Sequence, residues 1–208
     1  MNLDKEGIEN LNRIDRIKII NSVSGIKPAN LIGTISNDGQ ANVAIFSSVV
    51  HLGSDPALLG FILRPTGEVP RNTFDNIMEN HSYTINHVHP NFIKNAHYTS
   101  VKFDKNTSEF EKCHLQEEYI TAVKAPFVKE STFKMGMEFR EAIPIKLNNT
   151  LLVIGEIVHL IAPEGLYNDD DINLEKSNAV GISGLNRYYS VRKIGEFPYA
   201  RINEVPEF

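Results

Sequence analysis

Three strand-like segments follow one another in the first third of the chain, and they constrain the fold more than any other feature. The first two are predicted at residues 31–36 and 41–51, on either side of Asn37-Asp38-Gly39, a turn sequence whose glycine can take a positive φ. Asp55-Pro56 turns the chain again into an apolar strand at 57–63. Because strands joined by such short turns pair antiparallel, we expect these segments to be neighbours in an antiparallel sheet.

The rest of the chain adds more strands and only a few helices. Apolar residues at helical spacing predict an opening amphipathic helix over 9–23, which ends at Ser24 and Gly25. The further predicted elements are a helix from Pro70 to about Glu79, a strand at 82–88, a short helix at 90–97, an irregular polar segment at 99–121, and strands at 133–146 and 150–161. Hairpins interrupted by a few helices are typical of a mainly β fold, a Greek-key antiparallel barrel with peripheral helices, rather than of alternating β-α units.

Length and composition narrow the class of protein. With 208 residues, the chain is expected to form a single domain over 1–208, with a core at about 25–165 and a C-terminal extension at 166–208. The formal net charge of −5 argues against binding to nucleic acid or to an anionic membrane surface. The single cysteine, Cys113, rules out an intrachain disulfide and a thiolate zinc site. Together with the lack of a signal segment and of an apolar run of roughly 20 residues, this predicts a cytoplasmic protein without a membrane span.

A loop bracketed by two arginines follows the third strand. It supplies Arg64, Thr66, Arg71, Asn72 and Thr73 just before and within the start of a predicted helix. Guanidinium forks, hydroxyls and free backbone N–H groups at a helix start are the groups that bind phosphate. The alternative is that these arginines simply flank a turn on the surface.

The strand before this loop has small or polar side chains on part of its length. Asn42, Ala44, Ser47 and Ser48 would let a flat ligand with a polar edge approach the backbone. The same residues could instead be small residues on an edge strand, and Asn42 could merely finish the turn after Gly39. Their occurrence together, ahead of the arginine loop, favours a binding site for a flat, phosphorylated ligand.

Histidines and the cysteine give weaker signals. His87 and His89 would share one face of a strand, but no thiolate or carboxylate stands in register with them, so we expect polar surface histidines and no metal site. His51 ends a strand beside the expected site and either contacts the ligand or packs at the strand end. Cys113 has only Lys112 and His114 as basic neighbours in sequence, so it is expected to be a spectator thiol.

An ordered series of segments, rather than one short motif, resembles a known family. ANVAIFSSVVHLGSDPALLGF at 41–61, the arginine loop and YTINHV at 83–88 are similar to the flavin reductase-like, FMN-binding split-barrel family, in particular its flavoredoxin-like members. The similarity continues through NAHYTSVKFDKNTSEFEK at 95–112 and VIGEIVHL at 153–160.

The resemblance implies a split-barrel homodimer with one FMN per subunit near the dimer interface. The strand residues would lie along the isoalloxazine ring, and the arginine loop would meet the ribityl chain and phosphate. The residues that the resemblance assigns to FMN are Asn42, Ala44, Ile45, Phe46, Ser47, Ser48, Val49, Arg64, Thr66, Arg71, Asn72, Thr73, Tyr98 and Ser100. The tail around Asn186, Arg187 and Tyr188 is a weaker candidate. No catalytic acid or base is required of the protein, because the cofactor carries the redox chemistry.

The implied activity is an oxidoreductase that passes reducing equivalents from NAD(P)H, or from a protein donor, through FMN to an acceptor. One departure bears on it: family members that use NADH commonly carry Gly-Asp-His where this chain has Leu147-Asn148-Asn149. The alternative is therefore a flavin carrier or redox-sensing protein without turnover. A third possibility is a structural dimer that has lost its cofactor.

Overall fold

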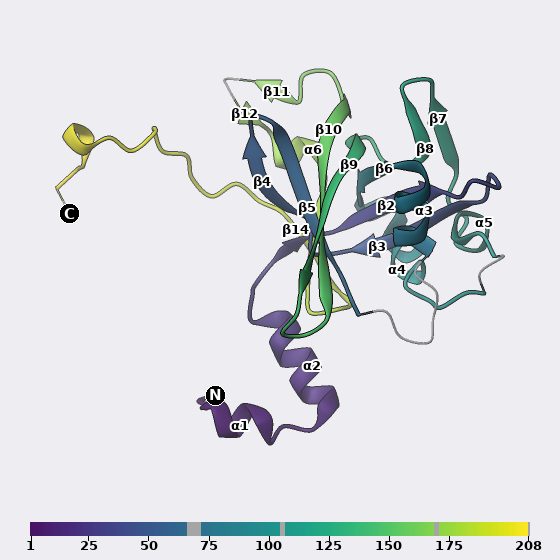
Figure 1. Ribbon diagram of the computed structural model, residues 1–208. Coiled ribbons are helices and arrows are strands. Elements are labelled where there is room, and N and C mark those ends of the chain that lie inside the picture. The colour runs from purple at the N-terminus through teal and green to yellow at the C-terminus, as the bar shows by residue number, and fades with distance from the viewer. Residues whose placement is uncertain (66–71, 105–106, 169–170, 208) are drawn as a thin grey trace.

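Seven strands form the central antiparallel sheet of the computed structural model, which describes residues 1–65, 72–104, 107–168 and 171–207 (Figure 1). Their order across the sheet is β3, β2, β6, β9, β10, β5, β4. The bounds are β2 (Asn30–Ile35), β3 (Ala41–Phe46), β4 (Val50–Ser54), β5 (Ala57–Leu63), β6 (Ser82–His87), β9 (Lys134–Ile145) and β10 (Thr150–Ile161). Hairpins supply three of the six strand pairs, β2–β3, β4–β5 and β9–β10, and the other three pairs join strands that are distant in sequence.

The sheet curls until its two edges approach each other. Phe46, at the end of edge strand β3, packs edge-on against Phe61 of β5 with ring centroids 5.0 Å apart, although β5 is next to the opposite edge. Between β3 and β4, the Ser48 hydroxyl donates to the Ile62 carbonyl at 3.2 Å and accepts from the Ile62 N–H at 3.0 Å. These contacts convert an open sheet into an almost closed barrel.

Burial explains why the strands hold this curl. Ile32, Phe61, Tyr83, Met137 and Val153 are fully buried in one cluster that includes residues of five strands. Burying a large apolar side chain stabilises the fold by about 1.5–3 kcal/mol. The cluster therefore accounts for a large part of the driving force for closure.

A second cluster lies between β2, β3 and the peripheral elements. Leu31, which neighbours Ile32 in β2, is fully buried here together with Val43, Val88 and Phe110. Adjacent residues of a strand point to opposite faces, so β2 is buried on both of its faces.

Short helices and small sheets surround the barrel. They are α3 (Asn72–Asn80), η1 (Pro90–Phe92), α4 (Ile93–Tyr98), α5 (Glu109–Lys112), α6 (Leu174–Ser177) and η2 (Ile202–Glu204), with the sheets β1 (Lys27–Pro28)–β13 (Val180–Ser183)–β14 (Arg187–Ser190), β7 (Glu117–Ile120)–β8 (Val123–Val128) and β11 (Tyr167–Asn168)–β12 (Asp171–Ile172). Val180 and Ile182 of β13 belong to the second core cluster, so part of the predicted C-terminal extension packs on the barrel.

The predicted mainly antiparallel β class is confirmed, with 39% strand and 22% helix. The predicted strand at 57–63 coincides with β5, and Gly39 turns the β2–β3 hairpin at φ +83°. The predicted strand at 41–51 is wrong as one element, because it breaks after Phe46 where Ser48 bonds to β5. The segment 99–121 is not wholly irregular either, since α5 and β7 lie in it.

The opening helix is shorter than predicted and lies off the barrel. Asn12 caps α2 (Arg13–Ser22) by accepting a hydrogen bond from the Asp15 N–H at 3.0 Å, so the helix begins later than the predicted start at residue 9. A separate short helix, α1 (Lys5–Glu9), precedes it. Both project from the body in Figure 1, and no residue of either helix is buried. Within the described residues, every helix is too short or too polar to cross a bilayer.

Candidate functional site

A cleft of about 760 Å³ opens beside edge strand β3. Its walls come from β3 and the connector to β4, the end of β5, the start of α3, the end of α4 with the segment up to Phe103, and the turn between β13 and β14. Parts of the chain that are far apart in sequence therefore meet at one site.

Two neighbouring serines of the strand wall of the cleft differ in their hydrogen bonding. Ala44, Ile45, Phe46, Ser47 and Ser48 line it. The hydroxyl of Ser48 is occupied by the two bonds to Ile62, which fix the connector. The hydroxyl of Ser47 makes no hydrogen bond among the described residues, so it can serve a ligand.

A buried polar network forms the floor. In the amide orientation that satisfies both ends of Asn42, its Nδ2 donates to Glu109 Oε2 at 3.0 Å and its Oδ1 accepts from Thr73 Oγ1 at 3.2 Å. Thr34 Oγ1 accepts from Asn76 Nδ2 at 3.1 Å in the same region. All five side chains are at most 9% exposed. The network ties β3, α3 and α5 together below the cleft.

Glu109 is the one buried carboxyl of this floor. Burial raises its pKa, while hydrogen bonds from the backbone N–H groups of Glu109 and Val43 act in the opposite direction. Burial therefore favours the neutral form of this carboxyl, which repels an anionic ligand less than the charged form does.

The start of α3 and the end of β5 make the cationic, donor-rich end of the cleft. Asn72 and Thr73 are the first two residues of α3, and Arg64 directly follows β5. The first N–H groups of a helix have no partner within it and carry a partial positive charge. Asn72 Oδ1 is buried and has no partner among the described residues, so it can accept a hydrogen bond from a ligand hydroxyl.

The structure brings most of the predicted site residues together. The predicted residues that line the cleft are Asn42, Ala44, Ile45, Phe46, Ser47, Ser48, Arg64, Asn72, Thr73 and Ser100. Thr66 and Arg71 lie outside the described residues. Val49 packs against the barrel core instead, and Tyr98 is half exposed, with its ring against His97.

Sequence reasoning missed several lining residues. Asn21 and Lys27 lie in segments that carried no recognisable motif, and Lys102 and Glu109 lie in the similar segment 95–112 but were not assigned to the site. Asn186, a weaker candidate, does line the cleft. The signal for Asn186 in the sequence was the family resemblance of the tail around it.

A hydrogen bond links one lining residue of the cleft to a distant element. His97 of α4 lines the cleft, and its Nδ1 lies 3.0 Å from the hydroxyl of Tyr188 in β14. Burial raises the pKa of Tyr188 to about 12. The phenol therefore stays protonated, and the bond holds β14 against α4.

The expectation of surface histidines is wrong for His87 and His89. Burial, with a smaller contribution from the charge of His89, lowers the pKa of His87 to about 4. The His87 ring stacks on the Phe133 ring, with the two ring centroids 4.5 Å apart. His89 is 4% exposed and accepts from the Thr132 N–H at 3.0 Å. The described residues contain no cluster of metal-ligating side chains.

Two further sequence candidates lie away from the chemistry. His51 is exposed and its Nε2 lies 3.2 Å from the Ser54 hydroxyl, so it does not line the cleft. Cys113 is buried, and burial, followed by the charge of Glu109, raises the pKa of its thiol. A protonated, buried thiol fits the expected spectator role.

Comparisons with known proteins agree on one family. The family model described as flavin reductase like domain matches residues 26–175. A split-barrel protein of Shewanella frigidimarina, classed among the flavin reductases, is 45% identical, covers 96% of this chain and 100% of its own, and superposes with a TM-score of 0.91. Flavoredoxin of Desulfovibrio vulgaris (Miyazaki F) shares the fold at 23% identity, covering 86% of this chain and 92% of its own, with a TM-score of 0.69.

A comparison of sequences adds a further relative. An uncharacterized protein of Aquifex aeolicus is 26% identical over 171 residues, which is 82% of this chain and 86% of the relative. The resemblance inferred from the ordered segments is confirmed, as is the split-barrel fold. The chain belongs to the flavin reductase like domain family.

Proposed function

We propose that the cleft beside β3 binds FMN and that the protein is a flavoprotein oxidoreductase. The carrying observation is that one cleft joins a strand wall of small side chains to Arg64 and the start of α3. Family membership supports FMN as the cofactor.

The residues of the cleft fit the three parts of FMN. The backbone of β3 and its connector, with Ala44 and Ser47, leaves room for a flat ring with polar edges. Asn72 Oδ1, which has no partner among the described residues, can accept a hydrogen bond from a ribityl hydroxyl. Arg64 and the N–H groups at the start of α3 suit a phosphate.

The protein's own groups would bind and orient rather than react. When bound, FMN supplies the electron-transfer chemistry, which the described side chains of the cleft lack. The floor of Asn42, Thr73 and Glu109 would fix the depth at which the ligand sits. Ser48 would hold the wall in place through β5. We assign no catalytic acid or base.

The proposed reaction passes reducing equivalents from NAD(P)H, or from a protein donor, through the bound cofactor to an acceptor. Family membership supports an oxidoreductase in general. The rival is a carrier or redox-sensing protein, which the sequence Leu147-Asn148-Asn149 at the turn between β9 and β10 favours. We further propose a homodimer with the cleft near its interface.

Calorimetric titration with FMN tests the binding site. Arg64→Ala should weaken binding about ten- to hundredfold, because a hydrogen bond to a charged group contributes about 1.5–3 kcal/mol. Lys146→Ala removes the same charge from the end of the β9–β10 hairpin and should leave the affinity unchanged. Equal FMN affinities of the two variants would show that Arg64 does not bind the phosphate.

Anaerobic mixing of the FMN-loaded protein with NADH and with NADPH tests turnover. Rapid loss of the visible flavin absorbance supports the oxidoreductase. An oxidised spectrum that persists with both nucleotides supports the carrier.

A further inference from the structure

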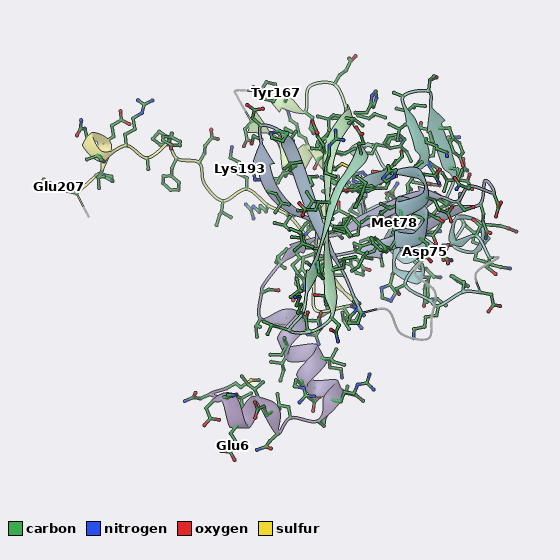
Figure 2. The ribbon with its side chains drawn as sticks, viewed as in Figure 1. Glu6, Asp75, Met78, Tyr167, Lys193 and Glu207 are labelled. Atoms are coloured by element: carbon green, nitrogen blue, oxygen red, sulfur yellow. The ribbon has the colours of Figure 1, made fainter. Side chains whose placement is uncertain are left out.

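The C-terminal arm, Val191–Glu207, leaves the body after β14 and extends away from it (Figures 1 and 2). Figure 2 labels Lys193 near its root and Glu207 at its far end, with the side chains between them standing clear of the barrel. Among the described residues, the hydrogen bonds of the arm stay within the arm. The root of the arm, up to Glu196, lines a pocket together with residues 171–176 of the body, whereas no hydrogen bond to the body holds the described residues beyond it.

Four apolar side chains of the arm are almost fully exposed. Ile194 is 98% exposed, Phe197 89%, Tyr199 85% and Ile202 93%. A monomer gains no hydrophobic stabilisation from a segment in this state, and it loses the entropy of ordering it. A surface elsewhere must receive these side chains if the arm is ordered in solution.

The charges of the arm do not call for a charged partner. Lys193 pairs with Glu196, and Arg201 pairs with Glu204 at 3.4 Å. Because these charges are neutralised locally, the arm offers a partner mainly apolar contacts.

Helix α2, at the other end of the chain, has the same unpartnered character. Ile14, Ile17, Ile20 and Val23 repeat every third residue and are 39–72% exposed. A spacing of three residues turns the side-chain direction by about 60° at each step, so these side chains spread over half of the helix circumference. This helix of 10 residues would be marginal alone in water, so its exposed apolar side chains also need a cover.

We propose that a second copy of this chain covers both segments, and that the C-terminal arm of each copy packs against the other. The inference rests on the homodimer of the proposed function and identifies the segments that form it. In a two-fold dimer each copy gives one arm and receives one, so a single kind of partner covers the exposed apolar side chains of both the arm and α2.

The size of the arm agrees with such an interface. Two aromatic side chains bury about 150–250 Å² each, and a stable interface needs about 800 Å² per partner. Phe197 and Tyr199 would supply about 300–500 Å² of that area, and the arm's isoleucines with α2 would supply more. The relative from Shewanella frigidimarina matches 96% of this chain, so the unmatched residues are fewer than those of the arm.

The interface would border the cleft. Asn21 of α2 and Lys27 of β1 line the cleft, and the Lys27 ammonium donates to the Asn21 carbonyl at 2.7 Å. A partner that covers the exposed apolar side chains of α2 therefore fixes the position of one wall of the site.

Sedimentation velocity of the full chain tests the proposal. The wild-type protein should sediment as a dimer at micromolar concentration. The double variant Phe197→Asp/Tyr199→Asp should raise the dimer dissociation constant on the order of a hundredfold, since it removes two aromatic anchors. Leu147→Asp, at a residue 99% exposed between β9 and β10, is the matched control and should leave the constant unchanged. Thermal melts by circular dichroism should show that both variants are folded, because neither position touches the core.

Photo-cross-linking shows which chain receives the arm. A benzoylphenylalanine placed at position 199, in a mixture of ¹⁴N- and ¹⁵N-labelled protein, should give cross-links that join the two isotopes. Cross-links confined to one chain would overturn the exchange. A dimer with an unchanged dissociation constant in the arm variant would overturn the arm's role alone, and a monomeric wild-type protein would overturn the homodimer as well. Flavin content measured on the same samples reports separately on the proposed cofactor site.

Discussion

Two neighbouring serines of the cleft wall should respond to truncation in opposite ways. The Ser48 hydroxyl makes two hydrogen bonds with Ile62, at 3.2 and 3.0 Å, whereas the Ser47 hydroxyl makes none among the described residues. Each such bond contributes about 0.5–1.5 kcal/mol, so Ser48→Ala should lower the free energy of unfolding by about 1–3 kcal/mol. Ser47→Ala should leave it within about 0.5 kcal/mol of the wild-type value.

Urea denaturation of the cofactor-free proteins measures the difference. The midpoint for Ser48→Ala should fall while the slope with urea concentration stays constant, because the surface exposed on unfolding is the same. In thermal melts the loss corresponds to about 2–4 °C per kcal/mol for a chain of this size.

For the affinity for FMN, the larger effect should come from Ser47→Ala. Ser47→Ala should weaken FMN binding about two- to tenfold, since it removes one neutral hydrogen-bonding group from the wall. The reasoning fails if Ser48→Ala is as stable as the wild type, or if Ser47→Ala is destabilised to the same degree.

Three further perturbations test the packing and the buried titratable groups. Gly155→Ala would place a methyl carbon 2.1 Å from Tyr83 Oη, so it should destabilise the fold by at least about 1–3 kcal/mol, while Gly53→Ala, with its nearest atom at 3.5 Å, should be tolerated in the same melts. Because the pKa of His87 falls to about 4 on folding, the unfolded chain gains a proton below pH 6.5 that the folded protein lacks. The free energy of unfolding should therefore decline from pH 6.5 to pH 4, by at most about 3 kcal/mol, and less steeply in His87→Gln. The raised pKa of Glu109 has the opposite sense: unfolding free energy should fall as pH rises above the ordinary carboxyl pKa of 4.5, and Glu109→Gln should abolish that loss in urea titrations.

Local patterns in the sequence were sufficient for the barrel's hairpins. Strand 57–63 and the turn at Gly39 follow from apolar runs and turn residues that are neighbours in sequence. The break after Phe46 could not be read in this way, because it depends on the bond between Ser48 and β5, which forms only when the sheet curls. Strand β8 was also missed, and Pro126 within it makes the segment look unlike a strand.

The candidate site was predictable where its residues are close in sequence. Asn42 and the residues of β3, with Arg64 and the start of α3, line one cleft as the ordered segments suggested. Glu109 was not predictable, because its polar surroundings in sequence indicate an exposed residue, whereas contacts with Asn42 and burial place it in the floor. The same holds for His87, whose burial depends on stacking with Phe133, far along the chain.

The visible absorption spectrum of the freshly purified protein, followed by mass spectrometry of the chromophore released on denaturation, tests the central claim most directly. The account predicts a flavin spectrum, FMN as the released compound, and up to one FMN per chain after saturation with added FMN. A colourless protein that also fails to bind added FMN in the titration would contradict it.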